Sequence, residues 1–435
     1  MNSSVKSYST RIFLASLLTV GLTSFFPAIQ AVAASDQDDA DLRLSLDKVE
    51  LDASTGRLNE GRALLEQLKQ KYPSAPEIQA LESELQLQND NRGIAFKEAS
   101  KLGTSGSLDR ENHQRAALLS PNGQFVSGGY NFRRTKETYE NIETIKGQMA
   151  IAPDLALSTT LINDTINTRV PFLHTNGTLQ GFSGDRQIGA ISADKFFSDG
   201  QEVVGSLYAV QNSAGLGGQY RFWDTSGASS ISVDFNKPDM DYVESAVEHG
   251  TKTNVILERK QIFSEEVQAR IDGKYTQYSL DGSSNAASAP GWDFDLDYTY
   301  PYIFSSDASS TGSFLADPFV FGARYGVGAE YFSHIQSSYS STHTAFSPLP
   351  VSSYEVHSFT ASATKNIFAG FQAEVSGGIA VNRIAGNSGP IYGLLLNYVI
   401  DKEIGVNFHA NRDLLGGQNN SEKEDNIGMD LKWMW

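Results

Sequence analysis

The alternation that decides the fold is WDFDLDYTY, at residues 292–300, where aromatic or aliphatic side chains take every even position. Aspartate or threonine takes every odd position between them. Because successive side chains of a β-strand point to opposite faces, this segment predicts a strand with one apolar face and one wet face. Residues 124–132 show the same period of two, with Val126, Tyr130 and Phe132 on one face. The chain is therefore expected to be mainly β from residue 124 onward.

Alternation and turn residues together predict sixteen strands in this region. Several are about ten residues or longer, the length at which a tilted strand crosses a bilayer. The expected strands are residues 124–135, 140–152, 155–167, 185–196, 201–211, 215–224, 228–236, 252–262, 267–280, 292–303, 319–332, 354–365, 368–382, 390–400, 404–411 and 426–435.

The expected connections alternate between short turns and mostly longer polar links, as they do in bacterial outer-membrane barrels. The segment 304–318 is an exception, because it is long where a short turn is expected. The pattern predicts a transmembrane antiparallel β-barrel of about sixteen strands over residues 124–435. The expected longer links are residues 168–184, 237–251, 281–291, 333–353, 383–389 and 412–425.

The N-terminus has the composition of a secretory signal peptide. Lys6 and Arg11 precede an apolar run at 12–26, and small residues follow at 31–33, where a cleavage site needs them. An uncleaved membrane anchor is the alternative, but it needs about 20 apolar residues and Pro27 interrupts the run. Residues 1–33 are therefore expected to be removed on secretion.

Charge and cysteine content exclude several classes of protein. Removing residues 1–33 takes away two basic residues and no acidic ones, so the formal net charge moves from -17 to -19. Such an acidic chain is not expected to bind nucleic acid, whose affinity depends on Lys and Arg. The absence of cysteine excludes disulfides, thiolate metal sites and a lipoprotein anchor.

Residues 34–105 are expected to be helical and to lie in the periplasm, and residues 106–123 are expected to form a linker. Leu64, Leu65 and Leu68 recur at helical spacing, Pro73 ends their helix, and a further helix is expected at residues 75–88. The stretch GRLNEGRALLE at residues 56–66 resembles the later part of a tetratricopeptide repeat. An amphipathic helical hairpin of no family remains the alternative.

The last expected strand ends in alternating aromatic residues, with Trp433 and Trp435 on the same face. An aromatic last residue closing an amphipathic strand resembles the C-terminal signal of outer-membrane barrels. The resemblance implies recognition by the barrel assembly machinery and contact with outer-membrane lipid.

The layout of signal peptide, tetratricopeptide-like helices and a C-terminal barrel of about sixteen strands resembles the exopolysaccharide export porins. These serve the poly-N-acetylglucosamine, Pel and cellulose secretion systems. The resemblance implies a passive conduit for an exopolysaccharide in biofilm matrix export. Its helical segment would dock a periplasmic polysaccharide-modifying enzyme or an inner-membrane synthase complex, or simply guide the polymer. The alternative is a barrel similar to the surface lipoprotein assembly modifiers, usually of fourteen strands, which delivers proteins to the cell surface.

No motif of enzyme chemistry is found. The sequence has no phosphate-binding loop, no H-E-x-x-H and no G-x-S-x-G, and its seven histidines show no metal-ligand spacing. His409 is expected to line the lumen. Asp293, Asp295 and Asp297 are spaced like calcium ligands, but Tyr298 stands where that loop needs glycine. A non-enzymatic protein without cofactor or metal is expected.

The same three aspartates are the strongest candidates for a functional site, because a strand places them in one row on the lumen face. A row of carboxylates would guide a cationic, partly deacetylated amino-sugar polymer by many weak contacts. Ordinary solvated lining, compensated by Arg270 and Lys274, is the alternative. Arg133, Arg221 and Arg324 share the inward parity, so the lumen is expected to be mixed in sign. Further candidates that share the inward parity are Asp234, Asp272, Tyr278, Glu330, Glu374 and Asp430.

Overall fold

A computed structural model describes most of the chain from residue 124 and a small part before it. The described residues are 124–152, 154–197, 201–210, 213–224, 226–264, 266–302, 319–340, 343–368, 371–400, 404–414 and 423–434, with 58–73 and positions 42, 45, 46, 48, 49, 75, 78, 81 and 82. The expected signal peptide, the linker at 106–123, the segment 304–318 and Trp435 lie outside them.

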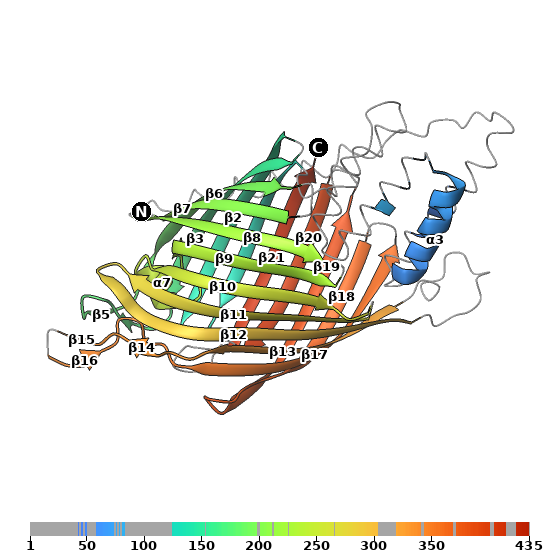
Figure 1. Ribbon diagram of the computed structural model, residues 1–435. Coiled ribbons are helices and arrows are strands. Elements are labelled where there is room, and N and C mark those ends of the chain that lie inside the picture. The colour runs from blue at the N-terminus through green and yellow to red at the C-terminus, as the bar shows by residue number, and fades with distance from the viewer. Residues whose placement is uncertain are drawn as a thin grey trace, which may run out of the picture. The chain divides into compact units, whose positions relative to one another are not determined.

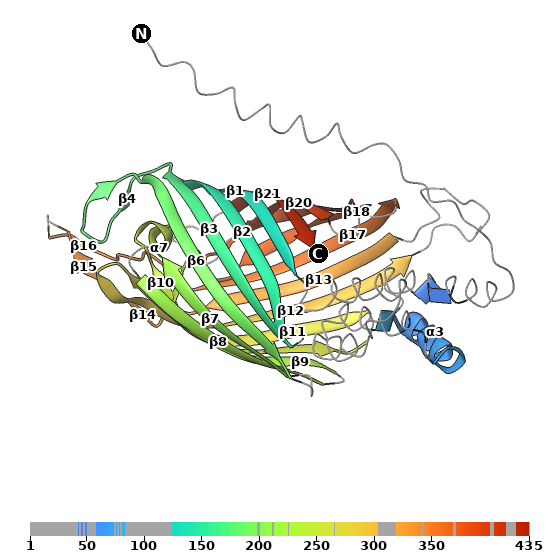
Figure 2. The same ribbon diagram turned by 90° about the horizontal axis from the view of Figure 1, so that it is seen from above.

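Within the described ranges, sixteen long antiparallel strands form a ring, each paired with its neighbours along the chain (Figures 1 and 2). They are β1 (Phe125–Arg134), β2 (Thr138–Ala152), β3 (Leu155–Thr168), β6 (Ser183–Phe196), β7 (Gln201–Val210), β8 (Ser213–Asp224), β9 (Gly227–Pro238), β10 (Thr251–Ile262), β11 (Val267–Leu280), β12 (Ser283–Tyr302), β13 (Phe319–Glu330), β17 (Tyr354–Phe368), β18 (Phe371–Asn382), β19 (Asn387–Val399), β20 (Ile404–Leu414) and β21 (Lys423–Met434).

The ring closes between the first and last strands. β1 pairs with β21 in antiparallel register from Phe125 opposite Met434 to Arg134 opposite Asp425. Closure removes the exposed sheet edges that an open sheet would have. The predicted antiparallel barrel of sixteen strands is therefore confirmed.

The alternation in sequence becomes two faces of the wall. On β12, Leu296, Tyr298 and Tyr300 are 38%, 46% and 49% exposed, whereas the side chain of Asp295 is 16% exposed. Large apolar side chains on the outside and charged side chains on the inside are the reverse of a soluble protein. This is the arrangement of a barrel whose outer face meets lipid.

The two ends of the barrel differ. One end, which we call the turn end, carries the N-terminus of β1, the C-terminus of β21 and connections such as the one between β10 and β11. The opposite end, the loop end, carries residues 239–250 with α7 (Val243–Val247), and 331–353 with β14 (His334–Ile335), β15 (Ser338–Tyr339) and β16 (Ala345–Phe346). The hairpin of β4 (Phe172–Leu173) and β5 (Leu179–Gln180) also lies there (Figure 1).

The expected long link at 281–291 was wrong. β11 and β12 are joined by a turn of only Asp281 and Gly282, with Gly282 at a φ of +79° that favours glycine. β12 therefore begins well before the large alternating residues. Its first half is built of small residues, and Ala286, Ala287 and Ala289 are fully buried. Small side chains make room for the loops that pack there, and they hide the strand period from sequence analysis.

The helical segment is described in part. Helix α3 (Leu58–Lys71) ends two residues before Pro73, with Leu65 and Leu68 buried. Lys69 forms an ion pair with Glu82 at 2.5 Å, which joins α3 to the helical residues that follow it. These contacts fit either a repeat or an unclassified helical hairpin, so the tetratricopeptide resemblance stays a prediction. No helix among these residues is long and apolar enough to span a membrane.

Candidate functional site in the barrel lumen

The expected carboxylate row lies on β12, on the face opposite the exposed aromatic side chains. In the register with the neighbouring strands, Asp272 of β11 stands opposite Asp293 and Arg324 of β13 stands opposite Asp297. Two residues along a strand advance about 6.6–6.8 Å, which is less than the Debye length of about 8 Å at physiological salt. Neighbouring carboxylates of the row therefore act in a common field.

Each carboxylate of the row also has a basic partner. Lys274 Nζ lies 2.8 Å from Asp293 Oδ2, and Arg324 Nη2 lies 2.8 Å from Asp295 Oδ1. Arg324 Nε is also 3.6 Å from Asp297 Oδ1. The row is therefore partly neutralised along its length, as the solvated-lining interpretation expected.

Arg270 extends this network on β11. Its Nη2 is 3.3 Å from Asp272 Oδ2, and its Nε is 3.7 Å from Glu258 Oε2 and 3.9 Å from Asp295 Oδ2. Acidic groups outnumber basic ones at this part of the wall, because six carboxylates meet four basic side chains. The carboxylates are Glu258, Asp272, Asp293, Asp295, Asp297 and Glu330, and the basic side chains are Arg270, Lys274, Arg324 and Lys260. The network is a connected lattice of charges with an acidic excess.

Three other expected lumen residues lie elsewhere around the ring. Asp234 on β9 accepts a hydrogen bond from Tyr208 at 2.9 Å. Glu374 on β18 accepts one from Thr364 at 3.2 Å. Asp430 on β21 has an exposed side chain. The structure thus gathers the candidates of β11, β12 and β13 and leaves these three apart.

The C-terminal residues are placed on two faces of β21. Trp433 is half exposed and pairs with Val126 of β1, on the face that carries the apolar side chains. His409 of β20 lies against Gly428, on the opposite, lumen face. These positions fit the expected orientations, and the assembly role of Trp433 stays a prediction.

Sequence analysis missed the most informative element, residues 239–250, which we call the inner segment. Arg133 of β1 donates to the Met240 carbonyl at 3.3 Å, and the ring of Tyr242 packs against Tyr278 of β11 with centroids 5.3 Å apart. β1 and β11 lie opposite each other in the ring, because equal numbers of strands separate them in both directions. The inner segment therefore crosses the barrel at its loop end.

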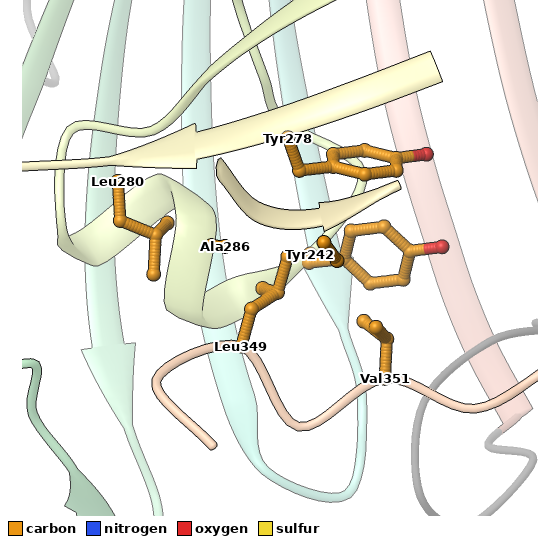
Figure 3. Close-up of a cluster of buried hydrophobic side chains, with 7 residues drawn as sticks. Tyr242, Tyr278, Leu280, Ala286, Leu349 and Val351 are labelled. Atoms are coloured by element: carbon orange, nitrogen blue, oxygen red, sulfur yellow. The ribbon is translucent and has the colours of Figure 1, made fainter. Parts of the chain in front are cut away.

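Apolar contacts hold the inner segment on both sides. Val243, Ala246 and Val247 of α7 form a buried cluster with Ile166 of β3. On the other side, Tyr242 joins a second buried cluster (Figure 3). The other members of this cluster are Tyr278, Leu280, Ala286, Ala287, Leu349 and Val351. Since α7 is buried on more than one side, the inner segment is a packed structural element.

Buried polar groups fix the two ends of the inner segment. The guanidinium of Arg186, on β6, donates to the Gly250 carbonyl at 2.6 Å and to the Asp239 carbonyl. Lys252 pairs with the Asp239 carboxylate at 3.4 Å, while burial raises the pKa of that carboxyl. Arg186 is 1% exposed and stands directly opposite Asp164 of β3. One buried side chain thus clamps both ends of the inner segment.

A second connection spans the loop end outside the inner segment. A side-chain carbon added to Gly177, in the β4–β5 hairpin, would come within 3.0 Å of the Ser340 Cα beside β15. The two hairpins are inserted at opposite sides of the ring, between β3 and β6 and between β13 and β17. Their contact therefore connects opposite sides of the ring at the loop end.

Two expected polymer-guiding residues are covered by the inner segment. Tyr278 and Glu330 are 1% and 5% exposed, and Tyr278 donates a hydrogen bond to Glu330 at 3.1 Å. Tyr242 donates to the same carboxylate at 3.2 Å. Burial raises the pKa of the Tyr242 hydroxyl well above its ordinary value, and nearby Tyr278 and Glu330 raise it further. The hydroxyl is therefore a proton donor at physiological pH.

One sequence signal could have revealed the inner segment. Tyr242, Val243, Ala246 and Val247 form an apolar group inside an acidic link between two strands. Such a group in a long barrel loop needs a partner, and the lumen supplies one here. In the part of the chain that the structure describes, no cluster of three or more His, Asp or Glu side chains could hold a metal ion.

No known protein family and no curated protein matches the chain. Among solved structures, one described as a bacterial polysaccharide outer membrane secretin is similar, with a TM-score of 0.53 and 7% identity over 72% of this chain and 99% of that chain. Salmonella typhi OmpF in complex with daunomycin gives 0.36 and 11%, over 71% of this chain and 97% of that chain. At such low identity the first likeness shows the barrel fold alone.

Proposed function

We propose that the chain is an outer-membrane porin that serves as a passive conduit for an exopolysaccharide. The observation that carries the proposal is a closed barrel whose lumen wall holds a connected charge lattice with an acidic excess. Many weak, exchangeable contacts along such a wall suit a moving charged polymer better than a single tight site. The polymer class that fits an acidic wall is a cationic, partly deacetylated amino-sugar chain.

Two further observations support this proposal over the delivery of lipoproteins to the surface. The ring has sixteen strands, the number expected for the polysaccharide porins, whereas the lipoprotein modifiers usually have fourteen. The similar structure with a TM-score of 0.53 is described as a polysaccharide secretin.

The proposed orientation follows from the even number of strands, which puts both ends of the barrel chain on one side of the membrane. The turn end would face the periplasm and the loop end the cell exterior. Residues 34–105 would then lie below the pore, within reach of a periplasmic polysaccharide-modifying enzyme or an inner-membrane synthase complex. The force for export would come from polymer synthesis, since the sequence offers no nucleotide-binding loop.

The test is to delete the gene for this chain from a bacterium that produces the polymer, and to measure polymer-derived amino sugar on the cell surface and in the periplasm. The proposal expects surface amino sugar to fall and periplasmic amino sugar to rise, with recovery when the parent chain is restored. Unchanged surface polysaccharide would overturn it. Loss of surface lipoproteins in the same cells would favour the alternative barrel.

A further inference from the structure

The side chain of Tyr242 packs against three side chains at the barrel wall. Its ring meets the ring of Tyr278 edge-on at 5.3 Å and that of Phe332 at 6.4 Å (Figure 3 shows the two tyrosines). Its hydroxyl donates to Glu330 Oε2 at 3.2 Å. Only 4% of Tyr242 is exposed. The inner segment therefore places one hydroxyl-bearing ring between two aromatic side chains and a carboxylate.

The three side chains that contact Tyr242 belong to the wall or directly follow one of its strands. Tyr278 lies on β11, Glu330 ends β13 and Phe332 follows it. The rings of Tyr278 and Phe332 are 6.0 Å apart, and Tyr278 holds the Glu330 carboxylate in place by its own hydrogen bond. Lys274 lies 3.7 Å from Glu330 and also pairs with Asp293, so its single charge is shared by two carboxylates. Without Tyr242, the wall would present two rings and a carboxylate beside Leu349 and Val351, which belong to the same buried cluster as Tyr278.

This chemistry suits one unit of an amino sugar. Aromatic faces attract cations and pack against the apolar faces of a sugar ring, and a carboxylate binds an ammonium or hydroxyl donor by a charge-assisted hydrogen bond. We propose that Tyr278, Phe332 and Glu330 form a hexosamine-binding subsite, and that Tyr242 is a built-in competitor that fills it when no polymer is present. The proposal deepens the proposed function and rests on it.

Competition follows from the geometry. A hexosamine unit and the Tyr242 ring would use the same rings and the same carboxylate oxygens, so both cannot be bound at once. A polymer unit that takes the subsite would displace Tyr242, and with it the inner segment that crosses the barrel. The two states are the barrel with Tyr242 in the subsite and the barrel with Tyr242 displaced. A ligand shifts the equilibrium between them only by its differential affinity, and here it binds only the displaced state.

The experiment measures block of ionic current through the purified full chain in planar bilayers, with glucosamine hexamer as the probe. In Tyr242→Ala, the concentration for half block should be at least about tenfold lower than in the parent, because no competitor remains. Adding Glu330→Gln to Tyr242→Ala should weaken block about tenfold by removing the charged acceptor. Tyr242→Phe is the matched control, since it keeps the ring and should be blocked less readily than Tyr242→Ala.

Three results would overturn the subsite. The first is block of Tyr242→Ala that is no stronger than block of the parent. The second is block of Tyr242→Ala that does not change when Glu330→Gln is added. The third is block of Tyr242→Ala by the neutral N-acetylglucosamine hexamer that equals block by the glucosamine hexamer. A second measurement does not depend on the fold of a variant: glucosamine hexamer should speed hydrogen exchange of the inner-segment amides in the parent chain, and unchanged exchange would also count against it. Failure of the export proposal is separate, because it appears as unchanged surface polysaccharide in cells lacking the chain.

Discussion

The clamp formed by Arg186 allows a quantitative prediction. Its guanidinium donates to the carbonyls of Asp239 and Gly250, where the inner segment begins and ends. Hydrogen bonds from a charged donor contribute about 1.5–3 kcal/mol each. The two bonds of the clamp therefore stabilise the inner segment in its packed position by about 3–6 kcal/mol. About 1.4 kcal/mol corresponds to a factor of ten in an equilibrium constant. Removing the clamp should therefore raise the fraction of molecules with a displaced inner segment at least about a hundredfold.

The variant should be made without leaving an unpaired buried charge. Asp164 stands opposite Arg186, so Arg186→Met is combined with Asp164→Asn, and Asp164→Asn alone is the control. Arg186→Lys is a second comparison, because an ammonium lacks the guanidinium fork and should hold fewer carbonyls at once. It should therefore give an intermediate result.

Two assays read the outcome. Single-channel recording should show the double variant in a high-conductance state far more often than the control. Hydrogen exchange should accelerate at the amides of Ala246 and Glu248, which donate to the carbonyls of Tyr242 and Glu244. Equal exchange and equal conductance in the double variant and Asp164→Asn would refute the conclusion that the clamp holds the segment.

Three further predictions concern the barrel as a whole. The unheated protein should migrate faster on a denaturing gel than the heated protein and fractionate with the outer membrane; recovery from the soluble fraction would contradict membrane insertion. Replacing Asp293, Asp295 and Asp297 with Asn removes three of the six carboxylates that the network joins, which are these three with Glu258, Asp272 and Glu330, so the local formal charge rises by three. Reversal potentials should then show lost cation preference, most clearly at low salt, and unchanged selectivity would make the row mere solvation. Trp435→Asp should abolish membrane assembly, and normal insertion would disprove the terminal signal.

The strands could be predicted because their environment is uniform. Lipid outside and water inside impose a period of two along most of the wall, and Leu296, Tyr298 and Tyr300 show it plainly. The prediction failed where a third environment intrudes. At residues 283–290, loops pack against the strand, both faces take small side chains, and the period disappears.

The charge lattice could be predicted only in part. Parity placed the three aspartates, Arg270, Lys274 and Arg324 on the inward face of three consecutive strands. The partnership of Arg324 with Asp295 and Asp297 depends on the register between β12 and β13, whose connection gives no register signal in the sequence. The acidic excess could thus be anticipated, but its degree of neutralisation could not.

The inner segment was invisible to pattern analysis for a physical reason. Helix α7 has only five residues, too few for an isolated helix to be stable or for helical periodicity to be recognised. Its stability comes from partners distant in sequence, such as Ile166 and Tyr278. Contacts of this kind are tertiary, so only the assembled ring reveals them.

On the proposed function, the inner segment and the charge lattice answer opposite needs. A lumen wide enough for a polysaccharide would leak small solutes if it stood open between polymers. A unit bound at the Glu330 subsite has to overcome the clamp of Arg186 as well as the contacts of Tyr242. A single weakly bound sugar cannot supply that free energy, but a chain that also contacts the row from Asp293 to Asp297 binds at several points, and tethering raises the effective concentration of its leading unit. The wall would thus admit a long cationic chain while a free monosaccharide leaves the inner segment in place.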